Sequence, residues 1–139
     1  MSELSYIQIE RRPDDIAIIT INRPEVLNAI NVDVITELSS AIDTVSADDS
    51  IKVVIITGKG ERSFCAGADI RYVVNINPIE AEKYASSVHT MLNKIENLEK
   101  PVIAAINALP VANTKRHTSE TQFANNYTTY TKRHLVLTI

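Results

Sequence analysis

Apolar and polar residues near the start of the chain follow two patterns, and each predicts a β-strand. Tyr6–Glu10 alternates between apolar and polar positions, which is typical of a half-buried strand. Ile16–Ile21 is almost entirely apolar and rich in β-branched residues, which predicts a buried strand. Pro13–Asp15 lies between them and has the composition of a turn. The segment therefore predicts an N-terminal β-hairpin.

Two longer segments place apolar residues at helical spacing. The first predicts a helix over about residues 32–46, with Asn31 as its N-cap. The second begins at Asn77–Glu80, where an Asx cap, a proline and a carboxylate follow the order of a helix start, and it ends before Pro101. The apolar stripe expected on this second helix is Ala81, Tyr84, Ala85, Val88, Leu92, Ile95 and Leu98.

Two short apolar runs between and after these helices complete the pattern. Val53–Ile56 and Val102–Ile106 each predict a buried strand. The order strand, strand, helix, strand, helix, strand predicts a layered α/β fold with right-handed crossovers. The last 27 residues show no persistent period, and they hold either a short edge strand at Leu135–Ile139 or no element at all.

Composition narrows the class of protein. The 139 residues are 45% apolar and 22% charged, which is typical of one soluble globular domain or part of one. A net charge of −3 gives no overall attraction to nucleic acid or to an anionic membrane. The single cysteine, Cys65, excludes an internal disulfide and a multi-cysteine metal site. The start has no signal-peptide pattern and no apolar run is long enough to span a bilayer, so we expect a cytoplasmic protein.

The charge balance changes abruptly near residue 112. Residues 1–112 carry 10 Lys/Arg against 16 Asp/Glu, a net charge of −6. Residues 113–139 carry four Lys/Arg against one acidic residue, a net charge of +3. The string Thr-Lys-Arg-His occurs twice, at 114–117 and 131–134, and we interpret it as an atypical tail rather than a nucleic-acid motif. The chain is therefore divided into a globular part, 1–112, and a tail, 113–139.

The stretch Ser63–Ile70 (SFCAGADI) is the most informative for chemistry. Gly67 allows a positive φ or a close approach of the backbone to a ligand, and Ala66 and Ala68 leave room beside it. If a helix begins at Ala68, its free amides can hold an anion or a developing oxyanion. Alone, such a stretch is more often a tight junction between a loop and a helix than a ligand site.

Three further blocks accompany this stretch, in a fixed order along the chain. They are Ile21–Ile30 (INRPEVLNAI), Val53–Gly58 (VVIITG) and Lys100–Asn107 (KPVIAAIN). Together with SFCAGADI, these blocks resemble the enoyl-CoA hydratase/isomerase family, the crotonases. The resemblance covers residues 5–107, about three quarters of the chain.

The resemblance implies a spiral of ββα repeats, of which this chain would hold only the N-terminal ones. It also implies a homo-oligomer, a trimer or a hexamer, and an acyl-CoA thioester as the ligand, with no metal and no cofactor except the coenzyme A of the substrate. The thioester oxygen would lie between two backbone amides, the first of which belongs to Ala68. The residues implied to contact the substrate are Val26, Leu27, Ala66, Gly67, Ala68, Asp69 and Ile70.

The sequence departs from the family pattern after Asn107. The family continues with a glycine and then a glycine triplet that supplies the second amide, whereas Ala108–Asn113 contains no glycine. Counted straight through, the second donor falls on Asn113 and the first catalytic glutamate on Arg116. Glu120 is the only carboxylate left in the tail. We therefore expect a catalytically incomplete chain.

A one-nucleotide frameshift is one hypothesis for this departure. Codons for Gly-Phe-Ala, GGC TTT GCC, read as Ala-Leu-Pro after a slip of one nucleotide, and Ala-Leu-Pro is the sequence at 108–110. The altered composition of the tail begins just after this point.

Two other functions stay open at this stage. The chain could be a non-catalytic fragment or CoA-binding module that associates with intact subunits. It could also be a peptidase, but Ser63 does not hold a nucleophile position and His89 has no evident partner. We interpret Cys65 as a packing residue, His89 as structural or exposed, and Asp69 first as a partner of a helix start. The loop Lys59–Arg62 is either solvated or in contact with the phosphates of CoA.

Overall fold

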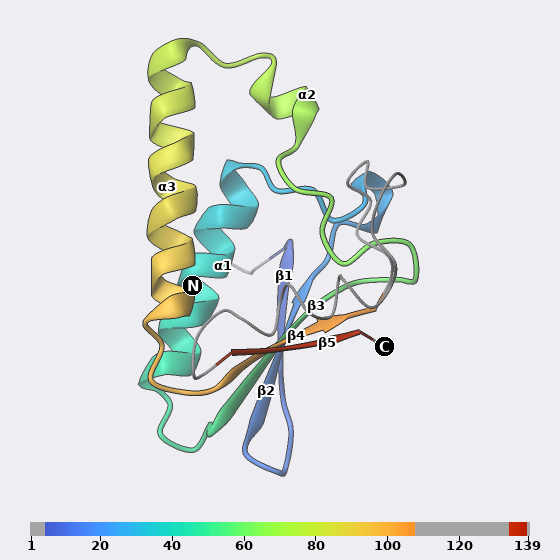
Figure 1. The fold of residues 1–139 in the computed structure, drawn as a ribbon, viewed down its shortest axis with the longest axis vertical. Helices are drawn as coiled ribbons and strands as arrows, with labels where there is room; N and C mark the ends of the chain where they lie inside the picture. Colours follow the sequence, from blue (N-terminus) through green and yellow to red (C-terminus); the bar gives the residue numbers. More distant parts are fainter. Residues whose placement is uncertain (1–4, 108–133, 139) are drawn as a thin grey trace.

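The computed structural model describes residues 5–107 and the backbone of residues 134–138 (Figure 1). In chain order, the strands, the 3-10 turn and the helices are β1 (Ile7–Arg11), β2 (Ile16–Ile21), η1 (Pro24–Val26), α1 (Val32–Ala47), β3 (Val53–Gly58), α2 (Ile70–Val73), α3 (Pro78–Glu96), β4 (Val102–Ile106) and β5 (His134–Thr138). The order of strands and long helices is the one that the sequence predicts. The short helix α2 lies where the sequence left a helix start near Ala68 open.

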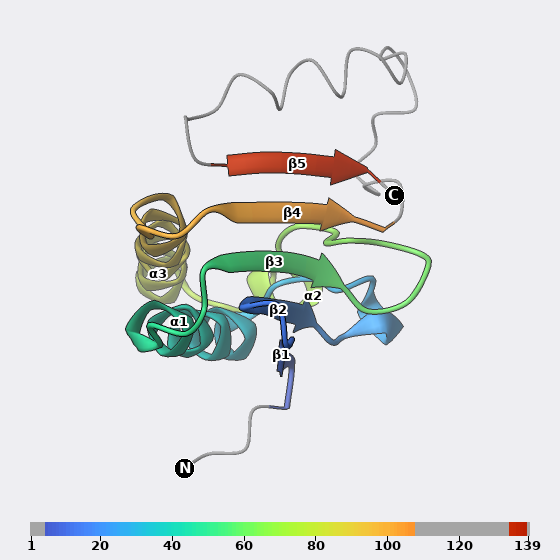
Figure 2. The same ribbon diagram turned by 90° about the horizontal axis from the view of Figure 1, so that it is seen from below.

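The described strands form one five-stranded sheet in the order β1-β2-β3-β4-β5. β1 and β2 are antiparallel and form the predicted hairpin, whereas β2, β3, β4 and β5 are parallel neighbours. The helices α1 and α3, which connect β2 to β3 and β3 to β4, lie on the same face of the sheet (Figures 1 and 2). The architecture is therefore a layered α/β arrangement, as the apolar pattern predicts.

The core lies between α1 and the face of the sheet that α1 covers. Every second residue of β2 is buried there, namely Ala17, Ile19 and Ile21, and Val54 and Ile56 of β3 follow the same alternation. The buried stripe of α1 is Val34, Ile35, Leu38, Ala41, Ile42 and Val45. Its 3.6-residue period places these six side chains on the sheet, as the sequence predicts.

The opposite face of the sheet corrects the prediction of strands that are wholly buried. Ile18, Ile55 and Ile103 lie side by side in the strand register and are only half-buried. Both long helices lie on the other face, so nothing in residues 5–107 covers this row completely. Burial therefore alternates along β2 and β3, although their sequences are apolar at nearly every position.

The packing face of α3 also differs from the predicted stripe. Met91 is its only fully buried residue, whereas Ala85 is exposed and Leu92 is 49% exposed. α3 packs on α1 along one side only, so the apolar residues on its other side stay in solvent. The helix is therefore rotated relative to the stripe expected from apolar spacing alone.

Both predicted helix caps are confirmed. The side chain of Asn31 accepts a hydrogen bond from the Val34 amide at 3.0 Å. At the start of α3, Asn77 accepts from the Glu80 amide, and the Glu80 carboxylate accepts from the Asn77 amide, which forms a complete capping box. These contacts satisfy amide groups that the first turn of a helix leaves free.

Several predictions lie outside the described residues. They concern Ala108–Asn113 with its second donor Asn113, Arg116 at a glutamate position, Glu120 and residues 113–133 of the tail, together with the frameshift hypothesis, whereas the backbone of residues 134–138 forms β5. Within residues 5–107, no helix is long and apolar enough to cross a membrane.

Replacing Ile19 by alanine should lower the free energy of unfolding by about 2–4 kcal/mol, because Ile19 has no exposed surface and lies under α1. The matched substitution Ile18→Ala, on the neighbouring half-buried position, should cost clearly less. Urea unfolding monitored by circular dichroism measures both values. Equal losses would contradict the assignment of the core to the α1 face.

Candidate functional site

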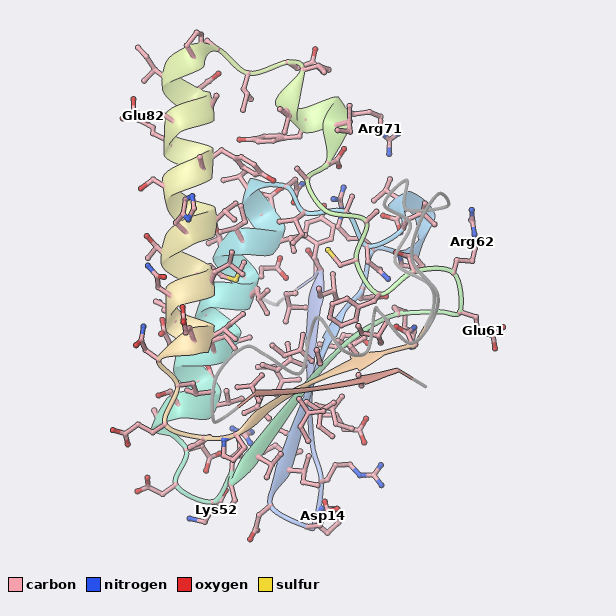
Figure 3. The ribbon with its side chains drawn as sticks, viewed as in Figure 1. Asp14, Lys52, Glu61, Arg62, Arg71 and Glu82 are labelled. Atoms are coloured by element: carbon pink, nitrogen blue, oxygen red, sulfur yellow. The ribbon has the colours of Figure 1, made fainter. Side chains whose placement is uncertain are left out.

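A shallow groove of about 440 Å³ lies beyond the carboxyl ends of β2 and β3. Its walls are the segment 25–29, which follows β2, and the segment 66–71 around the start of α2, with Arg62 from the loop between them. Carboxyl ends of parallel strands are where open α/β sheets place their ligands. In Figure 3, Arg62 and Arg71 project on the side away from α3, and Asp14 and Lys52 lie at the opposite end of the sheet.

The predicted substrate-contacting residues come together at this groove. Two segments that are about forty residues apart in the sequence supply them. Those that line the groove are Val26, Leu27, Ala66, Ala68, Asp69 and Ile70. Gly67 lies between two lining residues and is exposed. The structure thus brings the predicted set to one place, while its binding role stays a prediction.

A single β-bridge between Ile30 and Ala68 joins the two walls of the groove. The Ile30 amide donates to the Gly67 carbonyl at 2.8 Å, and the Asp69 amide donates to the Ile30 carbonyl at 2.9 Å. Both bonds use the peptide groups of Ile30, so the N–H of Ala68 lies on the opposite side of its segment. Among the described residues, no group accepts a hydrogen bond from the Ala68 amide.

α2 does not begin at Ala68, the helix start that the sequence left open. The helix begins at Ile70, and Asp69 caps it by accepting from the Arg71 amide at 3.1 Å. The free amide of Ala68 therefore owes its orientation to the bridge with Ile30 and not to a helix start. Gly67 precedes it with a φ of +89°, a conformation that residues with a side chain rarely adopt.

Tyr84 supports the bridge from α3. Its hydroxyl donates to the Ile30 carbonyl at 2.8 Å. Burial, followed by the negative potential of Tyr72 and Asp69 when they are ionised, raises the pKa of Tyr84. The phenol therefore stays protonated and remains a donor at neutral pH.

Asn28 holds the first wall against the loop after β3. It is completely buried, accepts from the Arg23 amide at 2.9 Å, and donates to the carbonyls of Lys59 and Ser63 at 3.0 and 2.8 Å. Its φ of +56° is in the left-handed region, which asparagine tolerates better than most residues. Sequence reasoning assigned no role to Asn28, although the residue lies inside a block that carries the family resemblance.

The loop after β3 approaches its neighbours closely at Gly58. A β-carbon at this position would lie 2.2 Å from the Phe64 carbonyl oxygen, so only glycine fits. The side-chain amide of Asn107, at the end of β4, donates to the carbonyls of Gly58 and Gly60. The side chains of buried Asn28 and half-buried Asn107 thus fix the loop that leads to Ala68.

The remaining candidate side chains give little support to other chemistry. His89 is exposed on α3, and the buried hydroxyl of Ser63 has no partner within residues 5–107, so the two do not form a nucleophile and base pair. Asp69 binds Arg23 and the Arg71 amide through its two oxygens. In the part of the chain that the structure describes, no three His, Cys, Asp or Glu side chains gather closely enough to hold a metal ion.

Known proteins are similar to this chain over most of the residues that the structure describes. Residues 11–113 match the model of the enoyl-CoA hydratase/isomerase family. The chain belongs to this family. A short-chain-enoyl-CoA hydratase of Clostridium acetobutylicum is 42% identical over 105 residues, and a crotonyl-CoA hydratase of Syntrophomonas wolfei is 39% identical over 99 residues. These matches cover 76% and 71% of this chain, but only 40% and 38% of the two relatives.

The fold of this family member agrees with solved structures. The crystal structure of an enoyl-CoA hydratase from Bacillus anthracis matches 75% of the chain with a TM-score of 0.72 at 31% identity, and the match covers 40% of that protein. The described residues therefore correspond to the N-terminal part of the crotonase fold, as the resemblance implies. The chain spans about two fifths of the length of the relatives that it matches.

Cys65 should react slowly with alkylating reagents. Burial raises the pKa of its thiol, and this effect exceeds the lowering by the Gly67 amide, which donates to Sγ at 3.4 Å. A smaller thiolate fraction at pH 8, where an ordinary cysteine of pKa about 8.5 is partly ionised, slows the reaction with iodoacetamide. The urea-unfolded chain is the control, and equal rates for the folded and unfolded chain would contradict this account.

Proposed function

We propose that the chain binds an acyl-CoA thioester in the groove, with the backbone amide of Ala68 donating a hydrogen bond to the thioester oxygen. The observation that carries the proposal is the Ala68 amide, which has no acceptor among the described residues and belongs to an exposed residue that lines the groove. Membership of the enoyl-CoA hydratase/isomerase family supports the choice of ligand. The metabolism of fatty acyl-CoA compounds is the process that this function serves.

Polarisation of the thioester is the chemistry that such a donor supplies. A hydrogen bond to the carbonyl oxygen withdraws electron density from a conjugated enoyl group, so its β-carbon becomes electrophilic toward water. The same bond stabilises an enolate, in which negative charge accumulates on the oxygen. One preorganised donor of this kind lowers a barrier by about 3–4 kcal/mol.

The rest of the groove suits the other parts of the ligand. Val26, Leu27 and Ala66 offer small or apolar surface for the pantetheine and acyl chain. Arg62 and Arg71 add positive charge at the rim, where it can attract the phosphates of coenzyme A. Coenzyme A enters this scheme only as part of the substrate, without a further cofactor.

Catalysis by this chain is proposed to be incomplete. The second amide donor would fall on Asn113 and the first glutamate on Arg116, both outside the described residues. Without a second donor and without a carboxylate to activate water, the chain polarises a thioester but does not hydrate it. The proposed location is the cytoplasm. There the chain forms a homo-oligomer, or it acts as a CoA-binding module that associates with intact subunits.

The purified chain should bind crotonyl-CoA and leave it unhydrated. Isothermal calorimetry should give a saturable heat with crotonyl-CoA and about tenfold weaker binding of S-butyl-CoA, a thioether that lacks the carbonyl acceptor. The enoyl absorbance should then decay no faster than in buffer. Equal affinity for the two ligands would contradict the hydrogen bond to the thioester, and turnover at a normal enzyme rate would contradict the proposed incompleteness.

Gly67→Ala should weaken crotonyl-CoA binding, because it strains the residue that precedes the donor amide. Its φ of +89° disfavours a side chain, although a β-carbon would meet no atom within 4 Å. Gly60→Ala is the matched control, since Gly60 has a φ of +85° and does not line the groove. Both variants should lose about 1–3 kcal/mol of stability. The proposal is wrong if calorimetry shows that both bind crotonyl-CoA as the wild type does.

A further inference from the structure

The guanidinium group of Arg23 joins the two walls of the groove from within the molecule. Its Nη1 donates to the Ala29 carbonyl at 2.7 Å and to Oδ2 of Asp69 at 3.2 Å. The two charged side chains are only 11% and 10% exposed. The Tyr6 ring lies 5.2 Å from the guanidinium carbon and covers one side of it.

The two acceptors lie beside the two residues of the β-bridge. Ala29 directly precedes Ile30, and Asp69 directly follows Ala68. The Asp69 peptide also takes part in the bridge, because its amide donates to the Ile30 carbonyl. A displacement of the Asp69 side chain is therefore transmitted to the peptide that adjoins Ala68.

The geometry of the ion pair favours a positioning role over a purely stabilising one. Strong arginine–carboxylate pairs use two parallel hydrogen bonds, whereas here one nitrogen is shared between a carboxylate and a carbonyl. The buried Nε has no hydrogen-bond partner within residues 5–107. Desolvation offsets much of the attraction in a buried pair, so the contact contributes less to net stability than to the placement of its neighbours.

We propose that Arg23 and Asp69 are positioning residues that fix the orientation of the Ala68 peptide group. Nη1 of Arg23 binds residues 29 and 69 at the same time. Gly67 and Asp69, on either side of Ala68, are both hydrogen-bonded to Ile30, so the Ala68 amide keeps one orientation although it has no acceptor of its own among the described residues. The effect on a bound thioester rests on the function proposed above. The effect on the amide itself is independent of any ligand.

The experiment compares four variants of the full 139-residue chain, labelled with nitrogen-15. Arg23→Met removes the cation, and Asp69→Asn removes the charge while it preserves the shape of the side chain and an oxygen for the Arg71 amide. Arg23→Lys is the conservative variant, because a single ammonium nitrogen can serve both acceptors. Arg12→Met is the matched control, since it removes the exposed Arg12–Glu10 pair, remote from the groove.

The first readout is backbone relaxation of the Ala68 amide in the chain without ligand. Its order parameter should fall from about 0.85 in the wild type toward 0.6 in Arg23→Met and Asp69→Asn. It should recover at least in part in Arg23→Lys and stay unchanged in Arg12→Met. An Ala68 amide that stays equally ordered in Arg23→Met and Asp69→Asn, or an equal loss in Arg12→Met, would overturn the inference.

The second readout is the carbonyl stretching frequency of bound crotonyl-CoA with a carbon-13 label at the thioester. The wild type should lower this frequency, whereas Arg23→Met and Asp69→Asn should lose most of the shift and bind about tenfold more weakly. A wild-type chain with an ordered Ala68 amide and no carbonyl shift would refute the proposed function. The positioning inference would then still be decided by the order parameters.

Discussion

The groove depends on one short interaction, the β-bridge between Ile30 and Ala68. Its two hydrogen bonds both use the peptide of Ile30, and this leaves the Ala68 amide without an acceptor among the described residues. A free amide beside a groove is the feature from which the proposed chemistry follows, because a donor that is already bound cannot polarise a carbonyl. The bridge joins segments that are far apart in the sequence, so it forms only when the α/β layers are in place.

Buried and half-buried polar side chains hold the segments around this bridge in position. Arg23 and Asn28 come from the segment after β2, Asn107 comes from the end of β4, and Tyr84 comes from α3. Each donates to backbone carbonyls, and Arg23 donates also to the Asp69 carboxylate. A polar group that is buried without a partner costs about 1–3 kcal/mol. The carboxyl ends of the parallel strands therefore have a defined shape even though they consist of loops.

Local signals in the sequence were sufficient for most of the fold. Ile16–Ile21 is β2 with both predicted ends, and the caps at Asn31 and Asn77 are confirmed, because these features depend on neighbouring residues alone. The sequence left the start of α2 open, and the packing face of α3 was predicted incorrectly. Their geometry depends on contacts with distant segments, which a local period cannot report.

The residues of the candidate site were predicted, but the hydrogen bonds that hold their segments in place were not. The family blocks place Leu27 and Ala68 in one site, and the structure brings both to one groove. The ion pair of Arg23 is formed with Asp69, 46 residues away along the chain, so no sequence pattern reveals it. A crystal structure of the chain with bound acetoacetyl-CoA tests the central claim most directly. We predict the thioester oxygen within about 3 Å of the Ala68 nitrogen. An acyl group bound elsewhere, or an Ala68 amide bonded to another part of the protein, would contradict the account.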